Sequence, residues 1–544
     1  MRARQSFDDG LKALLSQGLE VGGFGNYQDL ISIEIPKDNK FGDFSTNIAL
    51  RLSTSTKQDP ATIARSLVDN LKKILSQSSI SADIEEIKNV GGFVNFFLNR
   101  SFFYKQLSNI LKEKGDFGRQ NLGKGKKVLI EFVSANPTGP LSVAHARQAV
   151  VGDVLAKILG FLGYGVRREY YLNDEGNQVD ILGESVELRI KELSGEKIEF
   201  PENYYQGDYI YDIAKKTQGA KTGKTQDLRE FSVKYILDII RRELDDFGVE
   251  FDSWYSQKEL RKSGKIKKAL DIIKRDLYEE GGATWFRSTR YGDDKDRVVI
   301  KSDGAFTYLA PDIAYHYDKY KRGFKWLINL WGPDHHGYIN RLKGAVKALG
   351  NDPLSLSIII VQLASIFREG KPVEMSTRRG QYITLREVLD EVGRDASRFF
   401  FLMRRTDSHL DFDLELAKKE TPENPVYYIQ YAHARIFSIL KNSKRRDFKK
   451  AKLELLKEEE ELRILKRLSQ FPFVLHVILN TLDAYSITVY LQNLAADFHR
   501  FYDQHRVLGE DEDLTLSRLV LIEGTRIVLA KGLELLGVTA PEKM

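Results

Sequence analysis

The spacing of apolar and polar residues changes several times along the middle of the chain and predicts alternating strands and helices. An apolar run over 128–133, which only Glu131 interrupts, is typical of a buried strand. Proline and glycine interrupt it over 136–140, and a segment with helical spacing then continues to about Leu159. A second strand is predicted over Gly165–Leu172. Two strands joined by a helix of this length are expected to lie parallel in one sheet.

The end of the first strand is the expected place for a ligand. In parallel sheets ligands bind at the carboxyl ends of strands, and the unpaired N–H groups at a helix N-terminus favour phosphate. His145 falls in the first turn of the predicted helix. The polar turn 173–178 follows the second strand and is expected at the same edge of the sheet. The pattern therefore predicts a nucleotide-binding fold.

The second half of this fold supplies a candidate charged group. Buried strands are predicted over 326–331 and 358–363. Pro311 is predicted at the first position of a helix, which puts Asp312 in the first turn and Tyr308 one turn earlier. Taken alone, Asp312 has a second interpretation, namely a charge that stabilises the helix N-terminus.

The flanking parts of the chain have other patterns. Residues 31–35 alternate like a strand, 45–52 resemble a helix start, and 94–98 are typical of a strand. Glycines and lysines over 115–125 predict a linker, and beyond Asp413 the apolar spacing fits a helical bundle. We predict an α/β protein with three domains: an N-terminal α/β domain (1–114), a Rossmann-type parallel-sheet domain (115–410) with a helical insertion at about 182–282, and an all-α helical bundle (411–544).

Composition narrows the class of protein. The 544 residues include no cysteine, which excludes disulfides and thiolate zinc sites and is natural for a cytoplasmic protein. No apolar run approaches the length of a membrane span, and the first ten residues lack the core of a signal peptide. We therefore expect neither secretion nor membrane insertion. The net charge of +6 permits a polyanionic partner without requiring one.

The segment that begins at the first predicted strand resembles a known motif. It runs Glu131-Phe-Val-Ser-Ala-Asn136-Pro-Thr-Gly-Pro-Leu-Ser142-Val-Ala-His145-Ala-Arg147. This run resembles the first signature of class I aminoacyl-tRNA synthetases, in the form typical of arginyl-tRNA synthetases. The family usually has His-x-Gly-His where this chain has Ser142 to His145. Serine keeps a hydroxyl for hydrogen bonding, whereas Ala144 adds a methyl group where the nucleotide approaches the backbone.

The resemblance implies that ATP, bound with Mg²⁺, is a substrate and that no zinc is used. The implied ATP-binding residues are Pro137, Thr138, Gly139, Pro140, Ser142, Ala144, His145, Asp334, His335, His336 and Met375. The adjacent histidines 335 and 336 could also suggest a metal site. Neighbouring residues rarely converge on one ion without further ligands, so no metal is assigned to them.

A second signature is implied by residues 373–380. They resemble the class I Lys-Met-Ser-Lys loop, with Glu374 and Thr377 in place of its lysines. Attack on the α-phosphate of ATP builds charge on the leaving pyrophosphate, so the loop needs cations, which arginines could supply. The alternative is a solvated turn. The resemblance implies that the catalytic residues are Ser142, His145, Ser376, Arg378 and Arg379.

Recognition of arginine requires carboxylates, because burial of an unpaired guanidinium is costly and planar bidentate pairing favours Asp or Glu. The positions with which the family binds arginine correspond here to Glu131, Ser134, Asn136, Tyr308 and Asp312. Their joint presence favours this function for Asp312. It also disfavours another class I specificity, because an apolar amino acid would leave these carboxylates unpaired.

The terminal domains resemble the tRNA-contacting parts of the same family. Implied tRNA-binding residues are Asp43, Asn47 and Asn95 in the N-terminal domain, and Tyr431, Arg435, Phe498 and Tyr502 in the anticodon-binding bundle. For single aromatic residues a place in the core is the alternative. The lysine-rich segment 258–275 is interpreted as a surface helix, with an acceptor-stem contact as the alternative.

The sequence thus predicts an arginyl-tRNA synthetase, most simply a monomer, that activates L-arginine with ATP and transfers it to tRNA(Arg). The resemblance implies that the first step requires bound tRNA. A second hypothesis is a tRNA-binding relative that cannot activate arginine. It is motivated by Ala144, Glu374 and Thr377.

Overall fold

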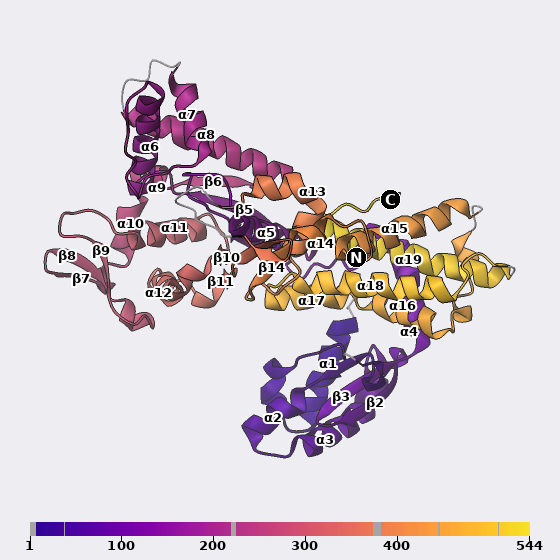
Figure 1. The fold of residues 1–544 in the computed structure, drawn as a ribbon. Helices are drawn as coiled ribbons and strands as arrows, with labels where there is room; N and C mark the ends of the chain where they lie inside the picture. Colours follow the sequence, from indigo (N-terminus) through magenta and orange to yellow (C-terminus); the bar gives the residue numbers. More distant parts are fainter. Residues whose placement is uncertain (1–6, 37, 219–224, 374–381, 444–446, 510) are drawn as a thin grey trace.

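The computed structural model describes residues 7–36, 38–218, 225–373, 382–443, 447–509 and 511–544. Figure 1 shows an N-terminal domain beside an elongated body formed by the central domain and the C-terminal helices, and the Phe44 ring contacts Phe473 of the C-terminal helices. In the N-terminal domain, helices pack against an antiparallel sheet of order β1-β3-β2. Its elements are α1 (Phe7–Val21), β1 (Phe44–Thr46), α2 (Ile48–Thr56), α3 (Pro60–Ile74), β2 (Ile84–Val90) and β3 (Phe93–Leu98).

The central domain is organised around a parallel sheet of order β11-β10-β4-β5-β6. Its strands are β4 (Lys127–Glu131), β5 (Gly165–Leu172), β6 (Ser253–Ser256), β10 (Trp326–Trp331) and β11 (Leu356–Ile360). Helix α5 (Val143–Phe161) connects β4 to β5 and is buried on nearly all sides. This helix, α11 (Leu309–Lys321) and α12 (Ile339–Ala348) pack close to the sheet. The predicted Rossmann-type parallel sheet is confirmed.

The segment predicted as a helical insertion is only partly helical. Helices α6 (Asn177–Leu193), α7 (Asp208–Gln218) and α8 (Thr225–Asp246) project together from the sheet (Figure 1). Strand β6 then returns to the sheet edge, so the segment 182–282 is not one insertion. The remaining elements are α9 (Gln257–Lys262), α10 (Lys265–Ile272), and an antiparallel sheet of β7 (Leu277–Glu280), β8 (Ala283–Phe286) and β9 (Arg297–Ile300).

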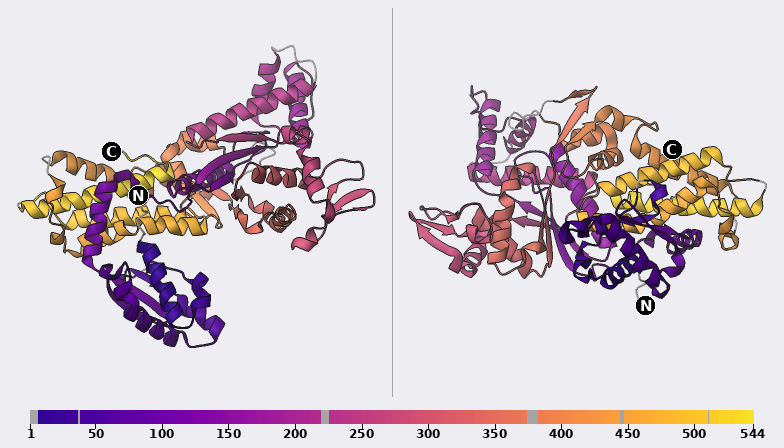
Figure 2. Two further views of the ribbon diagram at one scale, coloured as in Figure 1. Left: turned by 180° about the vertical axis from the view of Figure 1, so that it is seen from behind. Right: turned by 90° about the horizontal axis from the view of Figure 1, so that it is seen from below.

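The C-terminal part is helical, as predicted. A small sheet of β12 (Ala364–Arg368), β13 (Lys371–Pro372) and β14 (Leu410–Asp413) leads into it, together with α13 (Leu385–Phe401) and α14 (Leu414–Lys418). The bundle consists of α15 (Pro425–Asn442), α16 (Glu459–Ser469), α17 (Phe471–Thr481), α18 (Tyr485–Gln504) and α19 (Glu512–Leu536). Helix α4 (Arg100–Glu113) runs from the N-terminal domain into this bundle, where it packs on α16 and α19 (Figure 2).

One arginine joins the central domain to the bundle. Arg398 on α13 is fully buried and forms an ion pair with Asp153 of α5. Its Nε–H donates to the Leu536 carbonyl at the end of α19 over 2.9 Å, and Nη1 donates to the Phe247 carbonyl at the end of α8 over 3.0 Å. A Cβ atom at Gly537 would lie 2.5 Å from Nη2 of this arginine, so the close approach requires glycine. The guanidinium of Arg398 therefore links α13 to α5, α8 and α19.

Several local predictions are wrong in detail. Among the described residues, 31–35 form one isolated bridge, Glu34 to Ser45 of β1, because the segment pairs with that strand at a single residue. The segment 45–52 begins as strand β1 and becomes helical only at Ile48. Helix α11 starts before Pro311, since a first turn tolerates proline at any position whose N–H is unpaired. Strand β11 is an edge strand and is mostly half-buried rather than buried.

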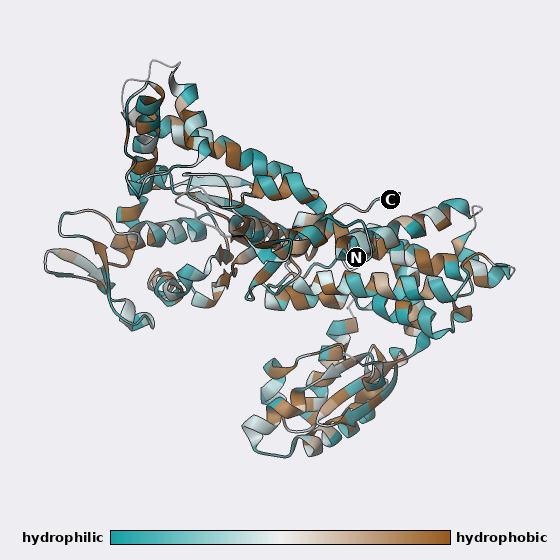
Figure 3. Ribbon diagram, in the orientation of Figure 1, coloured by the Kyte–Doolittle hydropathy of each residue, from teal (hydrophilic) through white to brown (hydrophobic). Residues whose placement is uncertain are grey.

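Hydrophobic residues gather on the strands of the central sheet and along α5, while the outer faces of the peripheral helices are hydrophilic (Figure 3). In the described ranges no helix is sufficiently long and apolar to cross a membrane.

Candidate active site

The chain makes a strained turn where β4 ends. Val133 and Ser134 have φ angles of 66° and 44°, in the left-handed region that side chains rarely adopt, and a β-branched residue is exceptional there. The Ser134 N–H donates to the Phe132 carbonyl over 2.9 Å, and its Oγ accepts the Tyr171 N–H over 3.1 Å. Strain of this kind persists only where neighbouring contacts hold it, as they do at functional sites.

The predicted ATP loop is held by side chains from elsewhere in the chain. The Tyr209 hydroxyl on α7 donates to the Thr138 carbonyl over 2.8 Å, and the Tyr382 hydroxyl donates to the Pro140 carbonyl over 3.0 Å. A Cβ atom on Gly139 would lie 3.1 Å and 3.2 Å from these hydroxyls, so the loop is tightly enclosed. The Leu141 N–H donates to Glu243 of α8 over 3.4 Å, and burial raises the pKa of Glu243 to about 7. The helical projection therefore helps to shape this loop.

His145 is neutral at the N-terminus of α5. Its Nδ1 accepts the Ser142 N–H over 3.2 Å, which leaves the proton on Nε2. Burial lowers the pKa of His145 to about 4, so the imidazole is uncharged near neutral pH. Ser142 is the N-cap of the helix, and Ala144 lies half-buried in the first turn. The arrangement offers hydrogen-bond donors to an anion at the positive end of a helix.

The segment that follows the second signature lies next to the first signature in space. Residues 374–381, which include Met375, Ser376, Arg378 and Arg379, lie outside the described residues. The segment that follows them is tied to the first loop, because the Leu385 N–H donates to the Leu141 carbonyl over 2.7 Å and Thr384 forms a bridge with Ser142.

Buried Arg147 links α5 to two loops from later in the chain. Its guanidinium donates to the carbonyls of Gln362 and Ser408, each over 2.8 Å, and to that of Arg405 over 2.9 Å. Helix α5 is thereby fixed to the segments that precede β12 and β14.

A row of polar residues crosses three strands beside the ATP loop. Asn329 on β10, Glu131 on β4 and Glu169 on β5 are register neighbours. Helix α11 covers the row: Lys319 Nζ lies 2.5 Å from Glu131 Oε2, and Arg322 makes two hydrogen bonds to Glu169 of 2.5 Å and 2.7 Å. The carboxylate predicted to bind arginine thus already has a basic partner.

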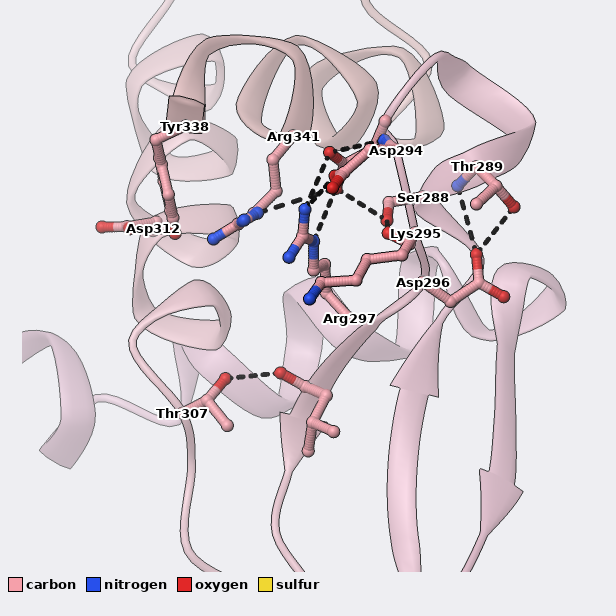
Figure 4. A network of polar contacts seen from close by, with 12 residues as sticks. Ser288, Thr289, Asp294, Lys295, Asp296, Arg297, Thr307, Asp312, Tyr338 and Arg341 are labelled. Carbon is pink, nitrogen blue, oxygen red and sulfur yellow. Dashed lines mark hydrogen bonds and ion pairs between the residues drawn. The ribbon is translucent and has the colours of Figure 1, made fainter. Parts of the chain in front are cut away.

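Asp312 lies at the start of α11 with a neutral partner. The Tyr338 hydroxyl donates to its Oδ2 over 2.6 Å. Arg341 lies between Tyr338 and the acidic turn before β9, where it pairs with Asp293 at 3.6 Å (Figure 4). Burial raises the pKa of Asp312 to about 7, with a smaller contribution from the charge of Glu131. A carboxyl group in this state gains from a bound cation.

The other predicted arginine-binding residues lie at the same edge of the sheet. Asn136 Nδ2 donates to Gln178 Oε1 over 2.5 Å, and its Oδ1 accepts from Asn173 over 3.1 Å. Tyr308 precedes α11 and is 78% exposed, which leaves it free to cover a ligand.

The predicted histidine pair lies in a short 3₁₀ helix, Pro333–Tyr338, after β10. Asp334, His335 and His336 are exposed, and His335 contacts the Trp331 ring. In the part of the chain that the structure describes, no cluster of His, Asp and Glu is arranged to hold a metal ion.

The sequence analysis missed several residues at this site, among them Lys319, Tyr338 and Glu243. One available signal was helical spacing: Asp312, His316 and Lys319 recur at intervals of four and three, so they share one face of α11.

The predicted tRNA-binding residues are distributed unevenly. Asp43 is buried and pairs with Lys466 at 2.8 Å, and Asn95 is buried in β3, whereas Asn47 is partly exposed. In the bundle, Phe498 is fully buried and belongs to the core. Tyr431, Arg435 and Tyr502 instead form a surface group: the guanidinium lies 4.6 Å and 4.7 Å from the centres of the two rings.

The parallel-sheet fold and the first signature at the end of β4 are those of a class I aminoacyl-tRNA synthetase. Residues 106–407 match the family model of the class I (R) tRNA synthetase catalytic domain. Residues 2–98 match the arginyl-tRNA synthetase N-terminal domain, and residues 429–544 match the DALR anticodon-binding domain.

Curated relatives are similar over nearly the whole chain. The arginine–tRNA ligase of Citrifermentans bemidjiense is 48% identical over 94% of this chain and 95% of its own, and that of Syntrophotalea carbinolica is 45% identical over 100% of both. The Thermus thermophilus arginyl-tRNA synthetase structure has the same fold, with a TM-score of 0.79 at 21% identity, and covers 99% of this chain and 100% of its own. The chain belongs to the arginyl-tRNA synthetase family.

Proposed function

We propose that this chain ligates L-arginine to tRNA(Arg) with consumption of ATP. The observation that carries the proposal is the juxtaposition, at one sheet edge, of a neutral imidazole at a helix N-terminus with a buried carboxyl group that gains from a cation. The first suits a nucleotide phosphate and the second a guanidinium. Family membership and the names of the relatives support the same reaction.

The reaction proceeds in two displacements. The arginine carboxylate attacks the α-phosphate of ATP, which forms arginyl-adenylate and releases pyrophosphate. A hydroxyl of the terminal tRNA ribose then attacks the arginyl carbonyl and releases AMP. The chain contributes position and charge stabilisation rather than a covalent intermediate.

ATP is bound along the loop from Pro137 to His145. In this proposal the Nε2–H of His145, the Ser142 hydroxyl and the free N–H groups of α5 donate to phosphate oxygens. Asp334, His335 and His336 line the nucleoside side of the site. The segment with Met375, Ser376, Arg378 and Arg379 supplies cations to the pyrophosphate. Its neighbour Thr384 is bridged to Ser142, which supports this placement. Mg²⁺ arrives with ATP as part of the substrate.

Arginine is bound between β4 and α11. Asp312 pairs with the guanidinium, Glu131 accepts a further hydrogen bond, and Tyr308 covers the substrate. Asn136 and Ser134 hold its amino acid end.

The tRNA contacts the N-terminal and C-terminal domains. We propose domain boundaries of 1–114, 115–410 and 411–544, in which the middle range is the catalytic domain. Tyr431, Arg435 and Tyr502 present stacking surfaces to splayed anticodon bases, a mode of recognition typical of single-stranded RNA. Asn47 is the surface candidate in the N-terminal domain. A requirement for tRNA in the first step, a monomeric state and a cytoplasmic location stay predictions.

The proposal is tested by aminoacylation of purified tRNA with arginine and, separately, lysine, alongside arginine-dependent ATP–pyrophosphate exchange with and without tRNA. We expect arginine-specific charging, and exchange only when tRNA is present. Tight tRNA binding without charging or exchange would instead favour the second function, a tRNA-binding relative, which Ala144 motivates.

A further inference from the structure

Helix α11 places two basic residues, one turn apart, on two glutamates of neighbouring strands. Lys319 pairs with Glu131 of β4, and Arg322 pairs with Glu169 of β5. The glutamates are register partners, but Lys319 is fully buried whereas Arg322 is 29% exposed, and Glu169 also accepts hydrogen bonds from Ser253 and Tyr315. Only Glu131 lies among the residues proposed to bind arginine. The pairs therefore offer a natural comparison between a structural and a functional role.

The ammonium group of Lys319 contacts three side chains. Its side chain is fully buried, and Nζ contacts Glu131 Oε2 at 2.5 Å and Asn329 Oδ1 at 3.1 Å. The Tyr315 ring centre lies 4.1 Å from the same Nζ. Among the described residues, hydrogen bonds reach Glu131 only at Oε2, and its side chain keeps 11% exposure. Lys319 therefore occupies one oxygen of the carboxylate and leaves the other for a ligand.

The same network reaches the second carboxyl group. Asn329 Nδ2 lies 3.0 Å from His316 Nε2, and His316 Nδ1 lies 2.8 Å from the Asp312 carbonyl oxygen. A carbonyl only accepts, so His316 donates from Nδ1 and accepts from Asn329. Lys319 is thus connected to Glu131 directly and to the backbone of Asp312 through two side chains. In the described part of the chain, Asp312 itself forms no ion pair.

The charges have a consequence for the substrate. Two unpaired carboxylates at one buried site repel each other, and one guanidinium balances only one of them. We propose that Lys319 is a positioning residue for arginine: its ammonium neutralises Glu131 from the helix side and leaves Asp312 as the carboxylate that balances the substrate. This role rests on the proposed function of Glu131 and Asp312. Lys319 acts through Glu131 and does not touch the substrate.

Steady-state aminoacylation by the full-length protein tests the role, with Lys319→Met as the main variant and Arg322→Met as its matched control. Both variants break an ion pair between the C-terminal end of α11 and a buried glutamate, so both are expected to lower the thermal midpoint. Lys319→Met raises the KM for arginine at least about tenfold and changes the KM for ATP less than about twofold. Arg322→Met changes both KM values less than about threefold.

The double variant Glu131→Gln/Lys319→Met gives a second, independent result. If Lys319 acts through the charge of Glu131, the double variant has the same KM for arginine as Glu131→Gln alone, because no charge is left to neutralise. Additive losses, or an equal rise in the arginine KM for Lys319→Met and Arg322→Met, would overturn the role. If Lys319→Met does not fold, the neutral pair Glu131→Gln/Lys319→Gln is compared with Glu131→Gln in the same way. Failure of the unmodified protein to charge tRNA with arginine would refute the proposed function instead.

Discussion

The ATP half and the arginine half of the proposed site are built from different interactions. In the ATP half, hydroxyl groups of Tyr209 and Tyr382 fix backbone carbonyls, and the imidazole is neutral. In the arginine half, the Glu131 carboxylate on β4 pairs with Lys319, and the Asp312 carboxyl group on α11 accepts a hydrogen bond from Tyr338. Single neutral hydrogen bonds are worth about 1 kcal/mol, whereas an unpaired buried charge costs several. Substitutions in the arginine half should therefore have the larger effects.

The largest effect is expected from Asp312→Asn, which removes the carboxylate that balances the guanidinium. We expect kcat/KM for arginine to fall on the order of a thousandfold, because the bound cation is left unpaired. Exchange assays with saturating ATP and titrated arginine measure it. Asp238→Asn on the exposed surface of α8 is the control. A loss below tenfold would show that another group balances the substrate.

His145→Asn should have the next largest effect. Loss of the Nε2–H donor is expected to lower kcat about a hundredfold with little change in the KM for arginine, as for removal of one charge-stabilising donor. Exposed His409 of the small sheet provides the matched variant His409→Asn. A rise in the arginine KM equal to the fall in kcat would contradict the division of the site into halves.

The pH dependence should separate the halves further. Arginine binding needs ionised Asp312, whose pKa is raised to about 7, so the KM for arginine should rise as pH falls from 8 to 6, by up to about tenfold per unit below 7. The KM for ATP should change less than about threefold over this range, since His145 stays neutral down to about pH 4. Parallel rises in both KM values would argue against Asp312 as the titrating group.

The same raised pKa predicts a stability change of opposite sign. Between the unfolded value of 3.8 and about 7 the folded protein holds the Asp312 proton more tightly, so stability is lost as pH rises through this window. Asp312→Asn should therefore raise the free energy of unfolding at pH 8 by up to about 4 kcal/mol. Urea melts at pH 8 and pH 4 measure the gain, which should vanish at the lower pH.

The smallest effect is expected from Tyr209→Phe. It removes one hydrogen bond to the Thr138 carbonyl, so the KM for ATP should rise about three- to fivefold. Tyr204→Phe, on the same projection but bonded to Glu184 at the surface, should leave it unchanged. An equal response of the two variants would mean that the projection does not shape the ATP loop.

Sequence reasoning succeeded where burial imposes one pattern. Trp326–Trp331 was located to the residue, because a buried strand of a parallel sheet needs an apolar run between turns. Gly165–Leu172 was also located to the residue, although it contains Arg167, Arg168 and Glu169, because glycines mark the turn before it. Strand β6 has four residues beside a charged helix and carries no such signal. The alternation of apolar and polar residues over 31–35 was misleading, because a strand forms only where another segment pairs with it along its length.

The candidate site shows the same limit. The first signature and Asp312 could be found from residue order, since adjacent residues share one loop or turn. The burial of Lys319 could not, because a lysine on a helix is exposed by default and only the packing of α11 over three strands encloses it. The ion-pair partner of Asp43, Lys466 of α16, likewise lies on an element remote in sequence.

Arg398 has a consequence for how such a protein can evolve. Its guanidinium satisfies carbonyl groups at the ends of α8 and α19 and neutralises Asp153 in the core of the central domain. Deletion or exchange of the terminal bundle would leave a buried cation with an unpaired N–H donor and expose the apolar surfaces around it. Most of the bundle thus matches a domain family of its own, but in the folded molecule it shares a buried arginine with the central domain. Recombination at the boundary between them would require new packing in the core of the central domain.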